Sequence, residues 1–450
     1  MAVHRSSIPS APASAPVSAS ASTSARTPAA GSAPPSASGP GTERSAALSA
    51  FTEEVFGHLP RQDQRRWAET YVKGLLGTPG RKSVRRMAAA VSAAPTASQS
   101  LHQFVSESPW PWEPSRRALA RWAGERAPVL AWTLSAVVAP KRGGHSVGVH
   151  RRFDEAAGRL VNCQVGMGIH VSTRRGAVPV DWRLHLPEAW CGDPRLRRRA
   201  RIPDSADARP LWGQALDLVD ALAGRTAGDP PPVVADGTEL DDCAALAAGL
   251  SGRSHRFLVS VPGNLAVHAG PALGAQRHPR GPSPAERLCV DDHLLQRGTS
   301  LRPPAPPRRL PGLPGRGSAG PLWTLSGPVH LPHSPHTLRL LAQWRPRRDR
   351  PARIWLTNLV HARPDELLPL VDAQARTGAA VDALCEDFGL LDFEGRSFPG
   401  WHHHTTLVSA AYGWHALSGA PTDPDGHRPA RPTPRPGPAA PPRALQHAGC

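Results

Sequence analysis

The chain has 450 residues, with 53 lysines and arginines against 36 acidic residues, so its formal charge is +17 with histidine neutral. Proline accounts for 52 residues, well above its ordinary share of about 5%. Hydrophobic residues make up 40% of the chain, which excludes a wholly disordered protein because a sizeable core is available. The longest apolar stretch, Pro128–Pro140, is shorter than the roughly 20 residues that cross a bilayer, so no membrane partner is expected.

The six cysteines are scattered and include no C-x-x-C pair. This spacing argues against a disulfide framework or a zinc ribbon and favours a reducing cytoplasm. The N-terminus has no compact apolar block behind a basic start, so no secretory signal is expected. Only three of the basic residues are lysine, so the charge has two explanations: the codon bias of a GC-rich genome, or a partner that carries phosphates.

Composition and hydrophobic periodicity divide the chain into six parts. They are a disordered Ser/Ala/Pro-rich tail (1–44), a helical module with possible DNA contacts (45–127), the first part of an α/β core (128–262), a β-rich Pro/Arg-rich insertion (263–350), the second part of the core (351–419) and a Pro-rich tail (420–450).

The clearest local pattern is a β-hairpin. Apolar residues fall at every second position from Val161 to Val171 and from Val178 to Leu186, with a Gly-containing connection between. A strand at Leu130–Val138 precedes it, and a helix, a strand ending at Asp236, a second helix and a third strand follow. This order predicts a mixed α/β sheet.

Asp236 follows a short buried strand, where side chains of α/β sheets project toward ligands. A carboxylate at this position is a candidate ligand for Mg²⁺. The alternative is a turn or helix-capping aspartate, with Thr238 as a competing cap. Asp241 and Asp242 are interpreted as first-turn residues of the next helix, where negative charge is favourable.

Trp401-His-His-His404 does not predict a metal site, because consecutive helical residues point in different directions. We expect these histidines at a helix start, with one or two reaching a carboxylate or a phosphate. The preceding loop, Gly389–Gly400, is dense in small, acidic and aromatic residues. In it, Glu394 is expected either to pair with Arg396 or to serve as a ligand.

Several segments stand in the order seen in bacterial insertion-sequence transposases, most similar to the actinobacterial group numbered seven hundred and one. They are Lys141–Val149, Val161–Val165, Trp182–Trp190, Val233–Asp236, Ile354–Leu359 and Gly389–His404. The resemblance covers about residues 50–418. It implies an RNase H-like core with an insertion before the last catalytic helix, and cleavage of element DNA by three carboxylates that hold two Mg²⁺ or Mn²⁺ ions.

The carboxylates that the resemblance implies are incomplete in this chain. Ser135 and Ala136 occupy the region of the first acid, Asp236 matches the second, and Gly378 stands where the third is expected. Asp154 and Glu155, the nearest acids after Ser135, are expected in a connecting turn. We therefore expect a degenerate transposase, with an Ala136→Asp variant recovering some cleavage; a divergent active site and a non-catalytic DNA-binding protein or relic are the alternatives.

The resemblance still nominates residues for each role. Candidate catalytic residues are Asp236, Glu394 and Glu386, with Asp236 as the metal ligand, and Asp382 and Asp387 are further nearby acids. Candidate DNA-contacting residues are Lys141, Arg142, Arg396, His402 and His404. The expected partner is double-stranded DNA, as element ends and target, with a homodimer as a candidate assembly.

Overall fold

The computed structural model describes residues 40–154, 158–269, 287–296, 322–345 and 350–419. The chain divides into a unit of residues 1–46, of which only the first turns of a helix are described, and a unit of residues 47–450. Both predicted tails lie largely outside the described residues, although the first helix begins at Pro40, inside the predicted N-terminal tail. No helix in the described segments is long and apolar enough to cross a membrane.

Helices precede the first strand, as the periodicity predicts. They are α1 (Pro40–Phe56), α2 (Gln62–Gly77), α3 (Val84–Val91), α4 (Ala97–Ser106) and α5 (Glu113–Arg126). α3 begins where Ser83 accepts a hydrogen bond from the Arg86 backbone N–H, a typical N-cap. Apolar residues of these helices, including Phe51, Tyr71 and Trp122, join the main hydrophobic core.

The core begins with an antiparallel arrangement. Its elements are β1 (Val129–Pro140), β2 (His150–Asp154), β3 (Arg159–Thr173), β4 (Ala177–Leu184), α6 (Glu188–Gly192), α7 (Pro194–Ala200) and α8 (Leu211–Ala223). The predicted hairpin is β3–β4, closed by a turn in which the Thr173 N–H donates to the Gly176 carbonyl. Two glycines of β3 make room for aromatic rings: an added Cβ would lie 2.9 Å from Trp401 at Gly166 and 2.7 Å from Trp182 at Gly168.

Parallel strands and the insertion complete the sheet. The elements are β5 (Val233–Asp236), the short 3₁₀ helix η1 (Gly237–Glu239), α9 (Cys243–Gly252), β6 (Phe257–Ser260), β7 (Ala266–Ala269), β8 (Arg287–Cys289), α10 (Val290–Gln296), β9 (Leu322–His330), β10 (Leu338–Trp344), β11 (Pro351–Thr357), α11 (Pro364–Glu386) and α12 (Phe398–Leu417).

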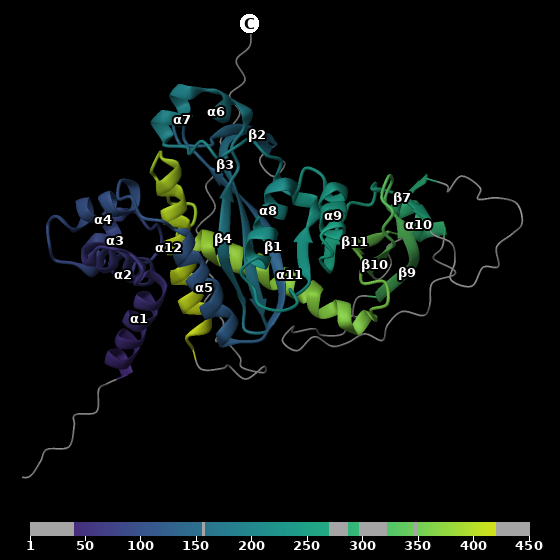
Figure 1. The fold of residues 1–450 in the computed structure, drawn as a ribbon, viewed down its shortest axis with the longest axis horizontal. Helices are drawn as coiled ribbons and strands as arrows, with labels where there is room; N and C mark the ends of the chain where they lie inside the picture. The colour runs from purple at the N-terminus through teal and green to yellow at the C-terminus, as the bar shows by residue number, and fades with distance from the viewer. Residues whose placement is uncertain (1–39, 155–157, 270–286, 297–321, 346–349, 420–450) are drawn as a thin grey trace, which may run out of the picture. The chain divides into compact units, whose positions relative to one another are not determined.

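One sheet runs through all of these strands. In its core the order is β4-β3-β1-β5-β6, with β1, β3 and β4 antiparallel and β1, β5 and β6 parallel. The sheet continues from β6 to β11, which belongs to the predicted second part of the core, and the strands of the predicted insertion, β10, β9, β7 and β8, extend it further. In Figure 1 they lie at the far end of the sheet from α12. The predicted mixed α/β fold class is confirmed.

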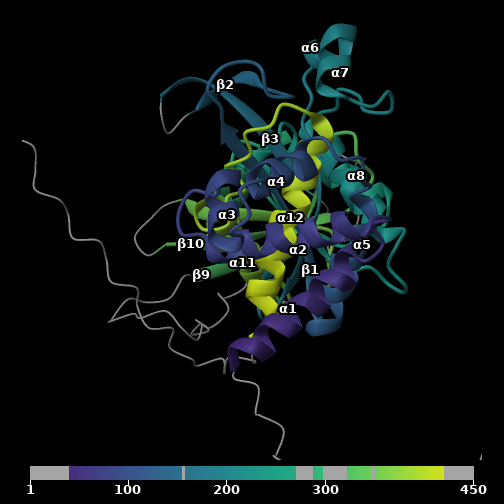
Figure 2. The same cartoon turned by 90° about the vertical axis from the view of Figure 1, so that its left-hand side faces the viewer.

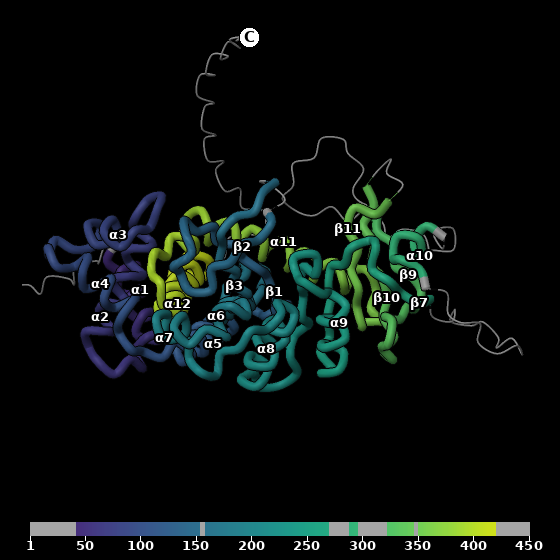
Figure 3. Tube along the Cα trace, turned by 90° about the horizontal axis from the view of Figure 1, so that it is seen from above, coloured from purple at the N-terminus to yellow at the C-terminus, as the bar shows by residue number. Residues whose placement is uncertain are grey.

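Helices cover both faces of the sheet. α8 and α9 lie on one side and α11 on the other (Figure 3). Ala131 of β1, Val234 of β5 and Leu258 of β6 pack with Leu370 and Ala373 of α11 in one hydrophobic cluster. α11 contacts β1, β3, β4, β5 and β6, so this helix crosses the core strands where the resemblance expects the third acid.

Candidate active site

Asp236 ends β5 and caps the turn that follows. Its Oδ1 accepts hydrogen bonds from the Thr238 N–H at 3.1 Å, from Thr238 Oγ1 at 2.6 Å and from Ser260 Oγ at 2.6 Å. The capping role that the sequence left open is therefore present. All three of these bonds go to Oδ1.

Ser135 occupies the place beside Asp236. β1 and β5 pair in parallel with Leu134 opposite Ala235, so the next pair along the strands brings Ser135 level with Asp236 on the α11 side of the sheet. The Ser135 Oγ is buried and has no hydrogen-bond partner in the described part of the chain. A neutral hydroxyl therefore stands next to the retained acid, and Ser135, not Ala136, is the residue in register with it.

Glu239 places a second carboxylate near Asp236 and Ala136, and the sequence analysis did not predict it. Its Oε2 accepts a hydrogen bond from the Ala136 backbone N–H at 3.4 Å. Although the residue as a whole is exposed, desolvation and the charge of Asp236 raise the pKa of Glu239, while the Ala136 N–H, Arg152 and Arg353 oppose that rise. In the sequence, only the three-residue spacing of Asp236-Gly-Thr-Glu239 links the two acids. That spacing brings their carboxylates together only when the turn between them is known.

A hydrogen bond between two uncharged side chains joins β1 to α11. Thr133 and Thr377 place their hydroxyl oxygens 2.5 Å apart, and Thr377 also donates to the Ala373 carbonyl at 3.0 Å. Gly378, at the third expected position, is exposed on α11. A Cβ at this position would meet nothing within 4 Å, so the structure has space for a side chain that the sequence lacks.

The residues present do not fit a two-metal site. Over the described ranges, no group of three or more His, Cys, Asp or Glu residues could hold a metal ion. Asp236 and Glu239 are two carboxylates, whereas the resemblance implies three. The expected Mg²⁺ or Mn²⁺ cofactor therefore has no complete ligand set in this part of the chain.

The other predicted acids serve elsewhere. Glu386 is exposed at the end of α11, where it and Asp382 lie near Cys385. Glu394 forms an ion pair with Arg81 at 2.5 Å, not with Arg396. Neither Glu386 nor Glu394 joins Asp236 in a group of three potential ligands within the described residues. Asp154 ends β2, and Glu155 lies outside the described residues.

Hydrogen bonds from the Lys82 backbone and the Lys141 side chain hold the loop after α11. Asp392 accepts a hydrogen bond from the Lys82 N–H at 2.7 Å, and Lys141 Nζ donates to the Phe393 carbonyl at 2.9 Å. Burial lowers the pKa of Lys141, which Asp392 and Glu394 partly offset. Lys141 is thus partly committed to this loop, whereas the other predicted contacts Arg142 and Arg396 are exposed.

The three histidines lie inside the protein at the start of α12. His402, His403 and His404 are each 1% exposed. His404 Nδ1 contacts the Tyr71 hydroxyl at 3.0 Å and its Nε2 lies 3.0 Å from the Gly389 carbonyl. Burial lowers the pKa of all three rings. This burial argues against the DNA contacts predicted for His402 and His404, because aromatic packing and backbone carbonyls occupy the rings instead.

A buried ion pair that the sequence did not reveal joins α5, β4 and α12. Arg116 Nη1 donates to Asp181 Oδ1 at 2.7 Å, with the two side chains 1% and 8% exposed. Its Nε donates to Thr406 Oγ1 at 2.8 Å and its Nη2 lies 3.1 Å from His402 Nδ1. Partners at such distances along the chain leave no local sequence pattern, which is why this network was missed.

Asp241 and Asp242 have separate capping roles. Asp242 caps α9 by accepting from the Ala245 N–H at 2.9 Å. Asp241, which was expected in the same turn, instead accepts from the Leu211 N–H at the start of α8. Neither aspartate lies in the first turn of α9, where both were predicted: Asp242 is its N-cap and Asp241 contacts the start of α8.

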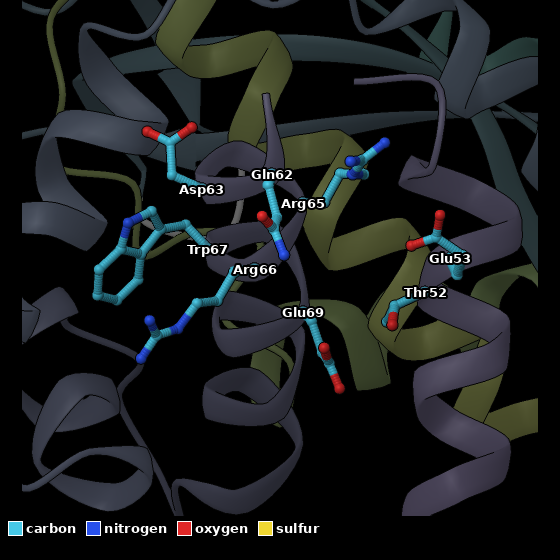
Figure 4. A pocket seen from close by; sticks show the side chains of 8 residues that line it. All are labelled: Thr52, Glu53, Gln62, Asp63, Arg65, Arg66, Trp67 and Glu69. Carbon is cyan, nitrogen blue, oxygen red and sulfur yellow. The ribbon is translucent and has the colours of Figure 1, made fainter. Parts of the chain in front are cut away.

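Two of the pockets in the described part of the chain lie away from Asp236. One of about 690 Å³ lies between α1 and α2 and has a mixed charge, with Glu53, Asp63 and Glu69 among arginines (Figure 4). The other, of about 620 Å³, lies beside the loop after α11 and is lined by Lys82, Arg85, Asp392 and Glu394, among others. Neither contains a residue of β1 or β5, so neither extends the site at Asp236.

A family model described as DDE superfamily endonuclease matches residues 54–305, more than half of the chain. The chain therefore belongs to the DDE superfamily endonucleases. No curated protein matches it. Among solved structures, it is similar to a piggyBac transposase in a synaptic complex with hairpin DNA, with a TM-score of 0.41 and 8% identity over 84% of this chain and 72% of that one.

Proposed function

We propose that this protein binds double-stranded DNA, at the ends of a mobile element of the insertion-sequence type, without cleaving it by two-metal chemistry. The observation that carries the proposal is the position of Ser135, which follows the β1–β5 pair Leu134–Ala235 on β1 as Asp236 follows it on β5. In a site whose chemistry needs three converging carboxylates, one expected position holds a hydroxyl and another, Gly378, holds no side chain. Loss of ligand geometry removes most of what a protein contributes to such catalysis.

The charge of the described surface supports a DNA partner. Exposed arginines lie near the start of α3, after β1 and within β2 and β3; they include Arg85, Arg142, Arg151 and Arg159. Each phosphate that an arginine neutralises releases counterions, so such a surface gains affinity for nucleic acid. The total charge of +17 has the sign that this partner requires. A homodimer and a cytoplasmic location remain parts of the same proposal.

A second candidate function is DNA cleavage through a rearranged set of acids. The hydrogen bond between Glu239 Oε2 and the Ala136 N–H favours it, because it puts a carboxylate against the strand that lacks its acid. This candidate requires Glu239 and Asp236 to act together. A Glu239→Gln variant would then lose cleavage while keeping its affinity for DNA.

Fluorescence anisotropy with labelled duplexes from both ends of the DNA that flanks the coding sequence tests the binding proposal. We expect affinity to fall by at least about 1,000-fold between 50 and 200 mM salt if six or more phosphates are contacted. Inverted repeats in the flanking DNA would identify the cognate duplexes, and unrelated duplexes of equal length serve as controls. Absence of binding at 50 mM salt, or affinity that salt leaves unchanged, would overturn the proposal.

A further inference from the structure

β3 and β2 form a two-stranded arm beyond the rest of the sheet. β1 ends at Pro140, which pairs with Cys163 of β3, and the Lys141 N–H still donates to the Asn162 carbonyl at 2.8 Å. From Val161 to Arg159 the ladder of β3 is with β2 alone among the described strands. Figure 2 shows β2 projecting away from the body of the sheet. We call His150–Asp154 together with Arg159–Asn162 the β2–β3 arm.

The arm displays an apolar pair to solvent. Phe153 and Leu160 stand directly opposite each other in the antiparallel register. They are 57% and 53% exposed, which makes them the two most exposed large hydrophobic residues of the described chain. Two side chains present too little area for a stable protein interface, which takes about 800 Å² from each partner. The pair is instead of the size of the apolar wedges that proteins insert at a base step.

Arginines surround this pair. Arg151 is exposed two residues before Phe153, so both lie on one face of β2. Arg159 is exposed on the neighbouring strand, opposite Asp154 and on the other face of the arm from Phe153 and Leu160. Arg142 is exposed next to Lys141 at the base of the arm. The arm itself contains Arg151, Arg152 and Arg159 against one acid, Asp154. An apolar pair flanked by cations complements DNA, in which apolar base faces lie between rows of phosphates.

We propose that the β2–β3 arm contacts duplex DNA with Phe153 and Leu160 inserted at a base step and with Arg151 and Arg159 on the flanking phosphates. This inference rests on the proposed DNA binding and adds a residue-level contact to it. Insertion of an apolar wedge requires local unstacking, which is less costly where bases are already unpaired. The arm therefore makes the protein favour a locally unpaired duplex over a fully paired one.

The test compares two labelled duplexes of equal length, one fully paired and one with a central mismatched segment, by anisotropy and by 2-aminopurine fluorescence at the mismatch. The unmodified protein binds the mismatched duplex about tenfold more tightly, the equivalent of about 1.4 kcal/mol. The double variant Phe153→Ala/Leu160→Ala loses this preference and the fluorescence change. The variant Arg151→Ala/Arg159→Ala weakens binding to both duplexes and lowers the salt slope by about 2. Leu295→Ala/Leu322→Ala, two exposed leucines outside the arm, is the matched control and behaves like the unmodified protein.

The outcomes separate this inference from the function on which it rests. If the apolar double variant keeps the preference for the mismatched duplex, the arm does not contact bases and the inference is overturned. If it keeps DNA binding unchanged but abolishes a dimer seen by light scattering, the arm binds a second copy of the chain and the inference is again overturned. If the unmodified protein binds neither duplex, it is the proposed DNA binding that fails.

Discussion

The hydroxyl oxygens of Thr133 on β1 and Thr377 on α11 lie 2.5 Å apart in a buried contact between strand and helix. Ser135 follows two residues after the first threonine, and Gly378 directly follows the second. The contact between β1 and α11 next to these two positions is therefore a hydrogen bond between neutral side chains. Because this bond carries no net charge, it stabilises the fold without attracting a cation.

Removing one partner of this pair should destabilise the fold. Thr377→Val leaves the buried Thr133 hydroxyl without its partner, at a cost of about 1–3 kcal/mol in the free energy of unfolding. The double variant Thr133→Val/Thr377→Val should cost less than the sum of the single variants, because neither hydroxyl is then left unpaired. Urea denaturation of the four proteins measures the coupling, and strictly additive costs would contradict the assigned bond.

Removing one partner of the Arg116–Asp181 pair should destabilise the fold strongly. Asp181→Asn leaves the buried guanidinium without its counter-charge, and the loss expected for breaking a buried pair is about 3–5 kcal/mol. The matched control is Asp220→Asn, which breaks an ion pair with Arg253 whose side chains are 43% and 38% exposed. That change should cost less than about 1 kcal/mol. Equal losses in the two variants would show that the Arg116 network does not act as described.

The buried histidines should make the protein sensitive to acid. Burial lowers the pKa of His403 and His404 to about 4, whereas both titrate near 6.5 once the chain unfolds. The unfolded chain therefore binds more protons between these values, so stability is fully present above about pH 6.5 and falls toward pH 4. Each ring contributes up to about 3 kcal/mol to this loss.

Unfolding free energies measured from pH 7 to pH 4 check the slope. His403→Asn should reduce this slope by the contribution of one histidine proton. His102→Asn, at an exposed position, should leave the slope unchanged. A curve for His403→Asn that runs parallel to that of the unmodified protein would show that this ring already titrates normally in the fold.

The pKa of Glu239 should depend on the charge of Asp236. Desolvation and the Asp236 charge raise the pKa of Glu239, so Asp236→Asn should lower that pKa, as followed by carboxyl carbon NMR. Because the raised pKa disfavours the ionised form in the folded state, stability is lost as pH rises from the ordinary glutamate range through the folded pKa. Glu239→Gln should consequently be slightly more stable than the parent at neutral pH. An unchanged Glu239 titration in Asp236→Asn would separate the two carboxylates.

Local patterns predicted much of the fold. The alternation on either side of the Gly-containing turn predicted the β3–β4 hairpin, and the short apolar run before Asp236 predicted β5 and the position of that acid at its end. Both are short-range features, encoded in the period of the strands and in the composition of the turn. The strands of the insertion were expected, but not that they would extend the central sheet, because edge pairing depends on distant segments.

The contacts of the candidate site were harder to predict from the sequence, because they too depend on distant segments. Glu239 meets Ala136 across 103 positions and Arg116 meets Thr406 across 290, so no local pattern marks either contact. The histidines at 402–404 suggested a polar helix start, whereas Trp110 and Trp112 stack on His403 and His402 and make that start part of the core. The polarity of these histidines predicted that they would be exposed, but their stacking on tryptophan rings buries them.

Cleavage of bound DNA tests the central claim most directly. The unmodified protein, Ser135→Asp/Gly378→Glu, and Asp236→Ala are each incubated with end-derived duplexes and Mg²⁺ or Mn²⁺, at concentrations where anisotropy shows the DNA to be bound. We predict binding without strand cleavage for the unmodified protein, and some recovered cleavage in Ser135→Asp/Gly378→Glu. Robust cleavage by the unmodified protein that Asp236→Ala abolishes would contradict the account, and would show that Asp236 works with acids other than those at the expected positions.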